Sequence, residues 1–109
     1  MGFFSNLFGF GKSKIDEDYM STAHLIPTYY SSFPIYQQKI IDTPQEKRTD
    51  KYDRLELYYY GKPLQEYYDL LKEQGFVQET EVRFNKSPNV YVIVERYGKK
   101  TKIAYHIAR

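Results

Sequence analysis

The stretch that decides the fold is Val90–Ala108, VYVIVERYGKKTKIAYHIA, close to the end of the printed sequence. Branched and aromatic residues favour strands, and Gly98-Lys99 suits a two-residue turn that requires positive φ at its first central position. The stretch therefore predicts an antiparallel hairpin with strands at Val90–Arg96 and Thr101–Ala108.

The position of this turn fixes which residues of the two strands lie opposite one another. With Gly98 and Lys99 at the centre, apolar residues face apolar residues and Glu95 faces Lys102. A shift by one pair would set Arg96 opposite Ile103. We therefore predict the pairs Val94–Ile103, Val92–Tyr105, Val90–Ile107, Glu95–Lys102 and Tyr91–His106.

Upstream of the hairpin, the pattern predicts a strand, a helix and a further strand. Leu55–Tyr60 is rich in strand formers, and Pro63 suits the first turn of a helix that runs to Gln74. Gly75 predicts a left-handed helix stop that lets the next residue fold back onto the helix. The third element alternates through Thr80, Val82 and Phe84, with a turn at Asn85–Asn89.

These elements predict an α+β fold: a small antiparallel sheet of four to five strands packed on one main helix, with a β-α-β-β-β C-terminal unit. Ile35–Ile41 is the candidate extra strand, Asp42–Asp53 reads as a polar loop and Asp16–Leu25 as a helix. A length of 109 residues suits one domain. We place it at residues 15–109, preceded by an apolar, Gly-containing segment at residues 1–14 that is flexible or docks.

Tyrosine is the unusual residue, with 13 copies beside 7 Phe. Alternation along the strand sends Tyr59 inward and Tyr58 and Tyr60 to the other face, where Tyr91 and Ile93 also point. Aromatic rings with polar tips suit protein contacts. The leading hypothesis is a non-catalytic protein-binding module of the adaptor, inhibitor or regulatory kind that uses Tyr58, Tyr60, Tyr91 and Ile93.

The same face is less polar than a solvated sheet face usually is. We therefore expect this face to be covered, and the candidates for the cover are the N-terminal phenylalanines, the segment around Tyr29, Tyr30 and Phe33, or a partner. A second copy of the chain is among the partners left open.

A nucleic-acid-binding role is the first alternative. Val82–Arg109 carries seven basic residues and one acidic residue. Cations that bind phosphates beside rings that stack on bases are the ingredients of a single-strand binding surface. The residues for this role are Arg96, Tyr97, Lys99, Lys100 and Lys102.

Peripheral membrane association is the second alternative. Phe3, Phe4, Leu7 and Phe8 would form one apolar face on a short helix, although few basic residues flank it, so binding to lipid would be weak. The opening resembles the Gly-Phe-Phe-x-x-Leu-Phe-Gly starts of many small bacterial cytoplasmic proteins, and a bacterial or phage-type protein is the corresponding expectation.

No catalytic constellation stands out in the sequence. His24 and His106 have no second ligand at metal-binding spacing, and no Gly-rich phosphate loop is present. We expect no enzyme activity, no metal and no cofactor. The absence of Cys fits a reducing compartment, so the expected location is cytoplasmic, with a membrane-peripheral location as the variant.

Overall fold

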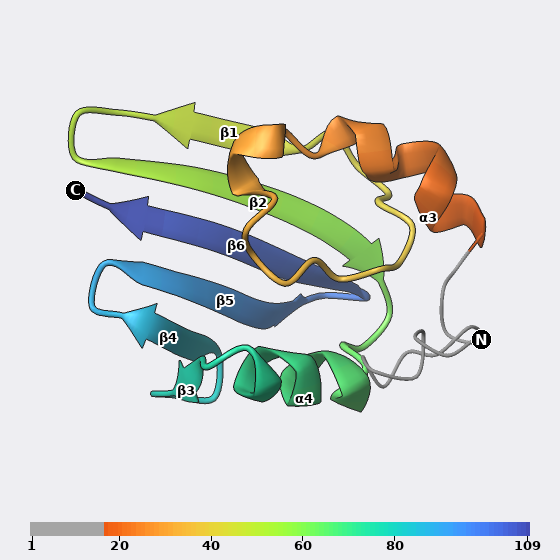
Figure 1. The fold of residues 1–109 in the computed structure, drawn as a ribbon. Coiled ribbons are helices and arrows are strands. Elements are labelled where there is room, and N and C mark those ends of the chain that lie inside the picture. The colour runs from red at the N-terminus through yellow and green to blue at the C-terminus, as the bar shows by residue number, and fades with distance from the viewer. Residues whose placement is uncertain (1–16) are drawn as a thin grey trace, which may run out of the picture.

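A six-stranded antiparallel sheet forms the centre of the protein in the computed structural model, which describes residues 17–109 (Figure 1). The strand order is β1-β2-β6-β5-β4-β3. The strands are β1 (Gln45–Arg48), β2 (Tyr52–Tyr60), β3 (Val77–Gln78), β4 (Arg83–Ser87), β5 (Val90–Tyr97) and β6 (Lys100–Ala108). The helices are α3 (Glu17–Thr22), α4 (Gln65–Glu73) and the 3-10 turns η1 (Ala23–Leu25) and η2 (Thr28–Tyr30).

The hairpin predicted at Val90–Ala108 is confirmed. β5 and β6 pair along their whole lengths, and Gly98 has a φ of 66° at the turn. All five predicted pairs occur: Val94–Ile103, Val92–Tyr105, Val90–Ile107, Glu95–Lys102 and Tyr91–His106. Because β6 also pairs with β2, it lies at the centre of the sheet.

The helix stop at Gly75 is also confirmed. Gly75 has a φ of 90°, its backbone N–H donates to the carbonyl of Lys72 (3.0 Å), and the N–H of Phe76 donates to the carbonyl of Leu71 (2.9 Å). These two bonds form a Schellman motif, in which a left-handed residue reverses the chain at the end of a helix. Phe76 and Leu71 are both buried, so the stop directs Phe76 into the core.

The core lies between the sheet and two covers that occupy the same side of it. One cover is α4, which buries Tyr67, Leu70 and Leu71; the other is the segment from η2 to Ile41 (Figure 1). The inward residues of the strands complete the core: Leu55, Leu57, Tyr59, Phe84, Val92, Val94, Ile103 and Tyr105.

The prediction of a strand at Ile35–Ile41 is wrong. This segment lacks regular secondary structure and crosses over the sheet, meeting β2 where the N–H of Ile41 donates to the carbonyl of Tyr58 (3.0 Å). Its apolar side chains Tyr36 and Ile40 are buried in the core. Burial of a covering segment and burial of a strand leave similar apolar patterns, which explains the error.

The predicted number of strands was too low. The expected loop at Asp42–Asp53 contains β1 and the beginning of β2, while β3 pairs with β4 at the opposite edge. All four residues of β1 are exposed, so this edge strand has no apolar alternation to reveal it. The strand expected at Thr80–Phe84 begins only at Arg83 and continues to Ser87.

Tyr30 and Phe33 lie on the core side of the sheet, where both are buried. The expectation that this segment covers the opposite sheet face is therefore corrected. The N-terminal phenylalanines, the other segment of the chain expected to cover the opposite face, lie outside the described residues.

Candidate functional site

The candidate site is the sheet face that points away from the core, here called the open face. Side chains alternate along each strand, so the pairing of the strands determines which residues share this face. Within residues 17–109, the helical segments lie on the other side of the sheet (Figure 1). The open face comprises Gln45, Lys47, Tyr52, Arg54, Glu56, Tyr58, Tyr60, Val77, Arg83, Asn85, Tyr91, Ile93, Glu95, Tyr97, Lys100, Lys102, Ala104, His106 and Ala108.

A stack of four side chains crosses this face, one from each of four neighbouring strands. The ring of His106 lies between Tyr52 and Tyr91, at centroid distances of 5.0 and 4.4 Å and interplanar angles of 19° and 17°. The guanidinium of Arg83 covers the far face of Tyr91 at 3.7 Å. The rings therefore stand upright on the sheet and present their edges to solvent.

His106 is also the acceptor that orients an arginine. An Nη of Arg54 lies 3.2 Å from Nδ1 of His106, and Nε of Arg54 donates to Glu56 (2.9 Å). Burial lowers the pKa of His106, and the positive charges of Arg54 and Arg83 lower it further. The neutral imidazole can then accept a hydrogen bond from Arg54 and stack between two rings.

Most cations of the open face have an acidic partner within the chain. Lys102 pairs with Glu95 (2.9 Å), Lys100 with Asp42 (2.8 Å) and Arg83 with Glu79 (3.0 Å). The hydrogen bond to Glu95 raises the pKa of Lys102. Burial alone would raise the pKa of Glu56, but hydrogen bonding to Arg54 and the nearby cations outweigh it and lower the value.

The four residues predicted for protein binding all lie on the open face, but they form two groups. Tyr58 and Tyr60 pair with Lys102 and Lys100 near the start of β6, whereas Tyr91 and Ile93 pair with His106 and Ala104 farther along it. The two groups therefore do not adjoin directly. Tyr58 instead packs near Tyr97 at a ring distance of 6.2 Å, while Tyr91 belongs to the stack. Tyr60 is exposed at the end of β2.

Sequence reasoning missed Tyr52, Arg54 and Arg83 as members of the site. The predicted pair Tyr91–His106 was the available signal for the stack, because it placed two rings side by side. The third ring was missed because Tyr52 was assigned to a loop. Its position beside His106 depends on the pairing of β2 with β6, two strands far apart in the sequence.

The residues of the nucleic-acid alternative lie along the β5–β6 hairpin. Lys100 and Lys102 are held in ion pairs, and Arg96 donates to the carbonyl of Gly98 (3.0 Å). Tyr97 is the exposed ring of this group, with the Lys102 ammonium 5.8 Å from its centroid, and Lys99 is exposed at the turn. Phe3, Phe4, Leu7 and Phe8, proposed for membrane docking, lie outside the described residues.

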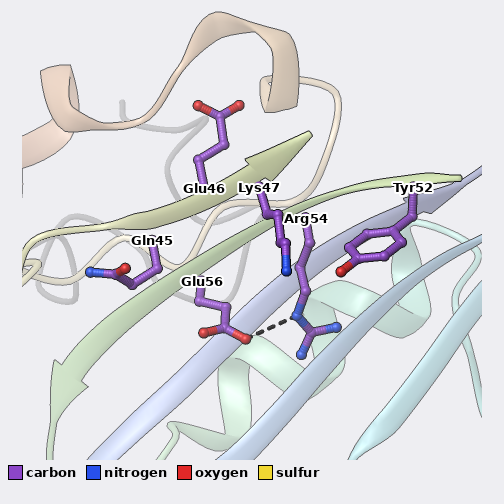
Figure 2. A pocket seen from close by; sticks show the side chains of 6 residues that line it. All are labelled: Gln45, Glu46, Lys47, Tyr52, Arg54 and Glu56. Carbon is purple, nitrogen blue, oxygen red and sulfur yellow. Dashed lines mark hydrogen bonds and ion pairs between the residues drawn. The ribbon is translucent and has the colours of Figure 1, made fainter. Parts of the chain in front are cut away.

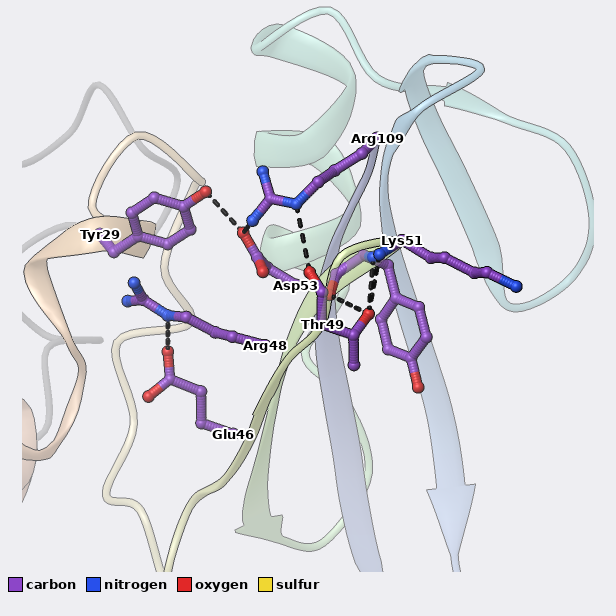
Figure 3. A network of polar contacts seen from close by, with 8 residues as sticks. Tyr29, Glu46, Arg48, Thr49, Lys51, Asp53 and Arg109 are labelled. Carbon is purple, nitrogen blue, oxygen red and sulfur yellow. Dashed lines mark hydrogen bonds and ion pairs between the residues drawn. The ribbon is translucent and has the colours of Figure 1, made fainter.

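A separate polar network lies at the edge of the core, beside the β1–β2 turn (Figure 3). Asp53 is fully buried and accepts hydrogen bonds from the hydroxyl of Tyr29 (2.6 Å) and from Arg109. The hydrogen bond from Tyr29 and the charge of Arg109 lower the pKa of Asp53 despite its burial. Arg48 lies over the ring of Tyr29 at 4.0 Å. This network fastens η2 to the sheet.

Among residues 17–109, no group of three or more His, Cys, Asp or Glu side chains is arranged to hold a metal ion. Within the same residues, none of the helices has the length and apolar character needed to cross a membrane.

Comparison with known proteins gives no relative from which a function could be transferred: no family model, curated protein or solved structure matches the chain.

Proposed function

We propose that this protein is a non-catalytic binding module whose open face docks onto an acidic surface of another protein. The observation that carries the proposal is the preorganised stack of Tyr52, His106, Tyr91 and Arg83 on the sheet face opposite the core. Side chains held in place before binding lose little conformational entropy when a partner arrives. Exposed tyrosines and an arginine are residue types enriched at protein interfaces.

The charge of the face indicates the chemistry of the partner. The open face carries five cationic side chains, Lys47, Arg54, Arg83, Lys100 and Lys102, against two acidic ones, Glu56 and Glu95. A complementary partner surface is acidic, because opposite potentials steer association and like charges oppose it. The aromatic edges between the cations supply the apolar contact area.

The arrangement favours a protein over single-stranded nucleic acid. Bases stack on ring faces, but both faces of His106 and Tyr91 are already covered within the stack.

The test is affinity capture from the source cell with matched variants. Tyr60 and Tyr97 are 76% and 60% exposed, so the double variant Tyr60→Ser/Tyr97→Ser removes contact area without opening the core. Met20 is 68% exposed on α3 and Met20→Ser is the control. We expect capture of one acidic protein by the wild type and Met20→Ser, with capture lost in the double variant.

Further measurements decide between this proposal and its rivals. With the captured protein purified, backbone amides of β2, β5 and β6 should gain protection from hydrogen exchange in the complex. Nuclease-sensitive capture would instead indicate nucleic acid. Equal capture by the double variant, or concentration-dependent doubling of the molecular mass of the isolated chain, would overturn the proposal.

A further inference from the structure

The open face contains a groove beside β1, which shares Lys47, Tyr52 and Arg54 with the proposed protein interface. Its volume is about 520 Å³, within the usual range for small-molecule sites. Its lining side chains come from β1 and β2 (Figure 2): Gln45, Glu46, Lys47, Tyr52, Arg54 and Glu56. Glu46 points away from the other five and pairs with Arg48 (2.7 Å).

One wall of the groove is the free end of the ring stack. His106 covers one face of Tyr52, with nearly parallel rings. β6, which carries His106, lies on one side of β2 and β1 lies on the other, so the second face of Tyr52 is directed toward β1 and the groove. A planar group that enters the groove can therefore continue the stack.

Two cationic side chains, Arg54 and Lys47, also line the groove, together with Glu56, which pairs with Arg54. Arg54 is fixed at two of its nitrogens, by Glu56 (2.9 Å) and by His106 (3.2 Å). Its remaining N–H groups are oriented in advance for an anion. Lys47 is exposed on β1 and its ammonium points toward Arg54 in Figure 2. Two neighbouring cations with several donors suit a phosphate group, which offers nearly two charges and three acceptor oxygens.

We propose that the groove binds an aromatic phosphate monoester, with its ring on the free face of Tyr52 and its phosphate on Arg54 and Lys47. A free nucleotide and the phosphotyrosine side chain of a peptide share this chemistry. The ring and the anion contribute together, so neither half of the ligand binds as well alone. This inference does not depend on the protein-docking role of the rest of the face.

The test is titration of the whole ¹⁵N-labelled protein, followed by NMR, with five probes. Adenosine 5′-monophosphate and a short phosphotyrosine peptide contain both parts; adenosine, the unphosphorylated peptide and inorganic phosphate contain one each. We expect saturable shifts of the Lys47, Tyr52 and Arg54 amides with at least one complete probe, and binding about tenfold weaker or worse with its incomplete counterparts. The complete probe that binds more tightly identifies the source.

Two variants locate the binding. Lys47→Gln changes an exposed side chain of an edge strand and should weaken binding about tenfold, whereas Lys99→Gln at the β5–β6 turn should leave it unchanged. Tyr52→Leu should weaken binding further while retaining a dispersed spectrum. The proposal is overturned if neither complete probe shifts these amides, if inorganic phosphate binds equally well, or if Lys99→Gln weakens binding as much as Lys47→Gln.

Discussion

The two faces of the sheet use tyrosine in opposite ways. On the core side, Tyr67 and Tyr105 are fully buried, and each hydroxyl needs a polar neighbour: Tyr67 donates to the carbonyl of Pro34 (2.7 Å) and lies 3.3 Å from Tyr105. Burial raises the pKa of both well above the usual value. On the open face, Tyr52 and Tyr91 are only partly buried and stack through His106.

The difference shows that the excess of tyrosine has two physical causes. In the core, tyrosine rings fill space between the sheet and its covering segment; the hydroxyls of Tyr67 and Tyr105 are hydrogen-bonded there, whereas those of Tyr30 and Tyr59 are buried without a partner among the described residues. On the open face, the rings support one another and leave their edges and hydroxyls to solvent. Substitutions on the core side should therefore lower the free energy of unfolding more than substitutions on the open face.

The largest expected effect comes from a matched pair on β2. Leu57 is fully buried, and Leu57→Ala should lower the free energy of unfolding by about 3 kcal/mol, because it leaves a cavity in the core. Tyr60→Ala, three residues along the same strand but largely exposed, should change it by about 0.5 kcal/mol or less. Urea unfolding followed by circular dichroism measures both. Equal losses of unfolding free energy in the two variants would contradict the difference between the two faces.

The next largest effect concerns Asp53 of β2, which holds η2 on the core side of the sheet through its hydrogen bond with Tyr29. Its folded pKa is lowered, first by the hydrogen bond from Tyr29 and also by Arg109. Its ionised form therefore stabilises the fold above the unfolded pKa of about 3.9, and this contribution is lost as the pH falls through the lower folded value. Asp53→Asn should be less stable than wild type at pH 7, with a difference that shrinks below about pH 4.

Tyr29→Phe is the milder companion of this variant. It removes the hydroxyl that lowers the pKa of Asp53 and keeps the ring under Arg48. We expect the folded pKa of Asp53, followed by carboxyl NMR, to move up toward its usual range. An unchanged value would mean that Tyr29 has no part in holding the network.

A backbone effect comes third. Gly75→Ala should destabilise the protein by about 1 kcal/mol, because the residue has a φ of 90° that a side chain disfavours. A Cβ at this position would meet nothing within 4 Å, so the cost is conformational and not steric crowding by neighbours. Gly75→Asn should cost less, since Asn tolerates the left-handed region. A neutral Gly75→Ala in thermal melts would contradict the role of the Schellman motif.

The smallest effect is expected on the open face, in the titration of His106. Burial and the charges of Arg54 and Arg83 place its folded pKa below the usual value of about 6.5. The neutral form is therefore favoured in the fold, and stability falls slightly as the pH drops below about 6.5 toward the folded pKa. Arg83→Gln should raise the pKa of His106 in an NMR titration, while Arg96→Gln, at the other end of β5, should not.

Local signals in the sequence were sufficient for several features of the C-terminal part of the fold, although they missed β3 and the start of β4. The turn at Gly98, the register of β5 and β6, the inward direction of Tyr59 and the stop at Gly75 were all predicted correctly, because each depends on neighbouring residues or on one short turn. The segment before β2 gave weaker signals. An apolar covering segment resembled a strand at Ile35–Ile41, and the polar edge strand β1 resembled a loop.

The candidate site was predictable only in part, for the same reason. Sequence alternation alone placed Tyr58, Tyr60, Tyr91 and Ile93 on one face, since side-chain direction in a strand has a period of two. Only the tertiary structure decided that these residues form two groups at different positions along β6 and that Tyr52, Arg54 and Arg83 join the site. Those neighbours are set by pairing between strands distant in the sequence, which no local pattern encodes.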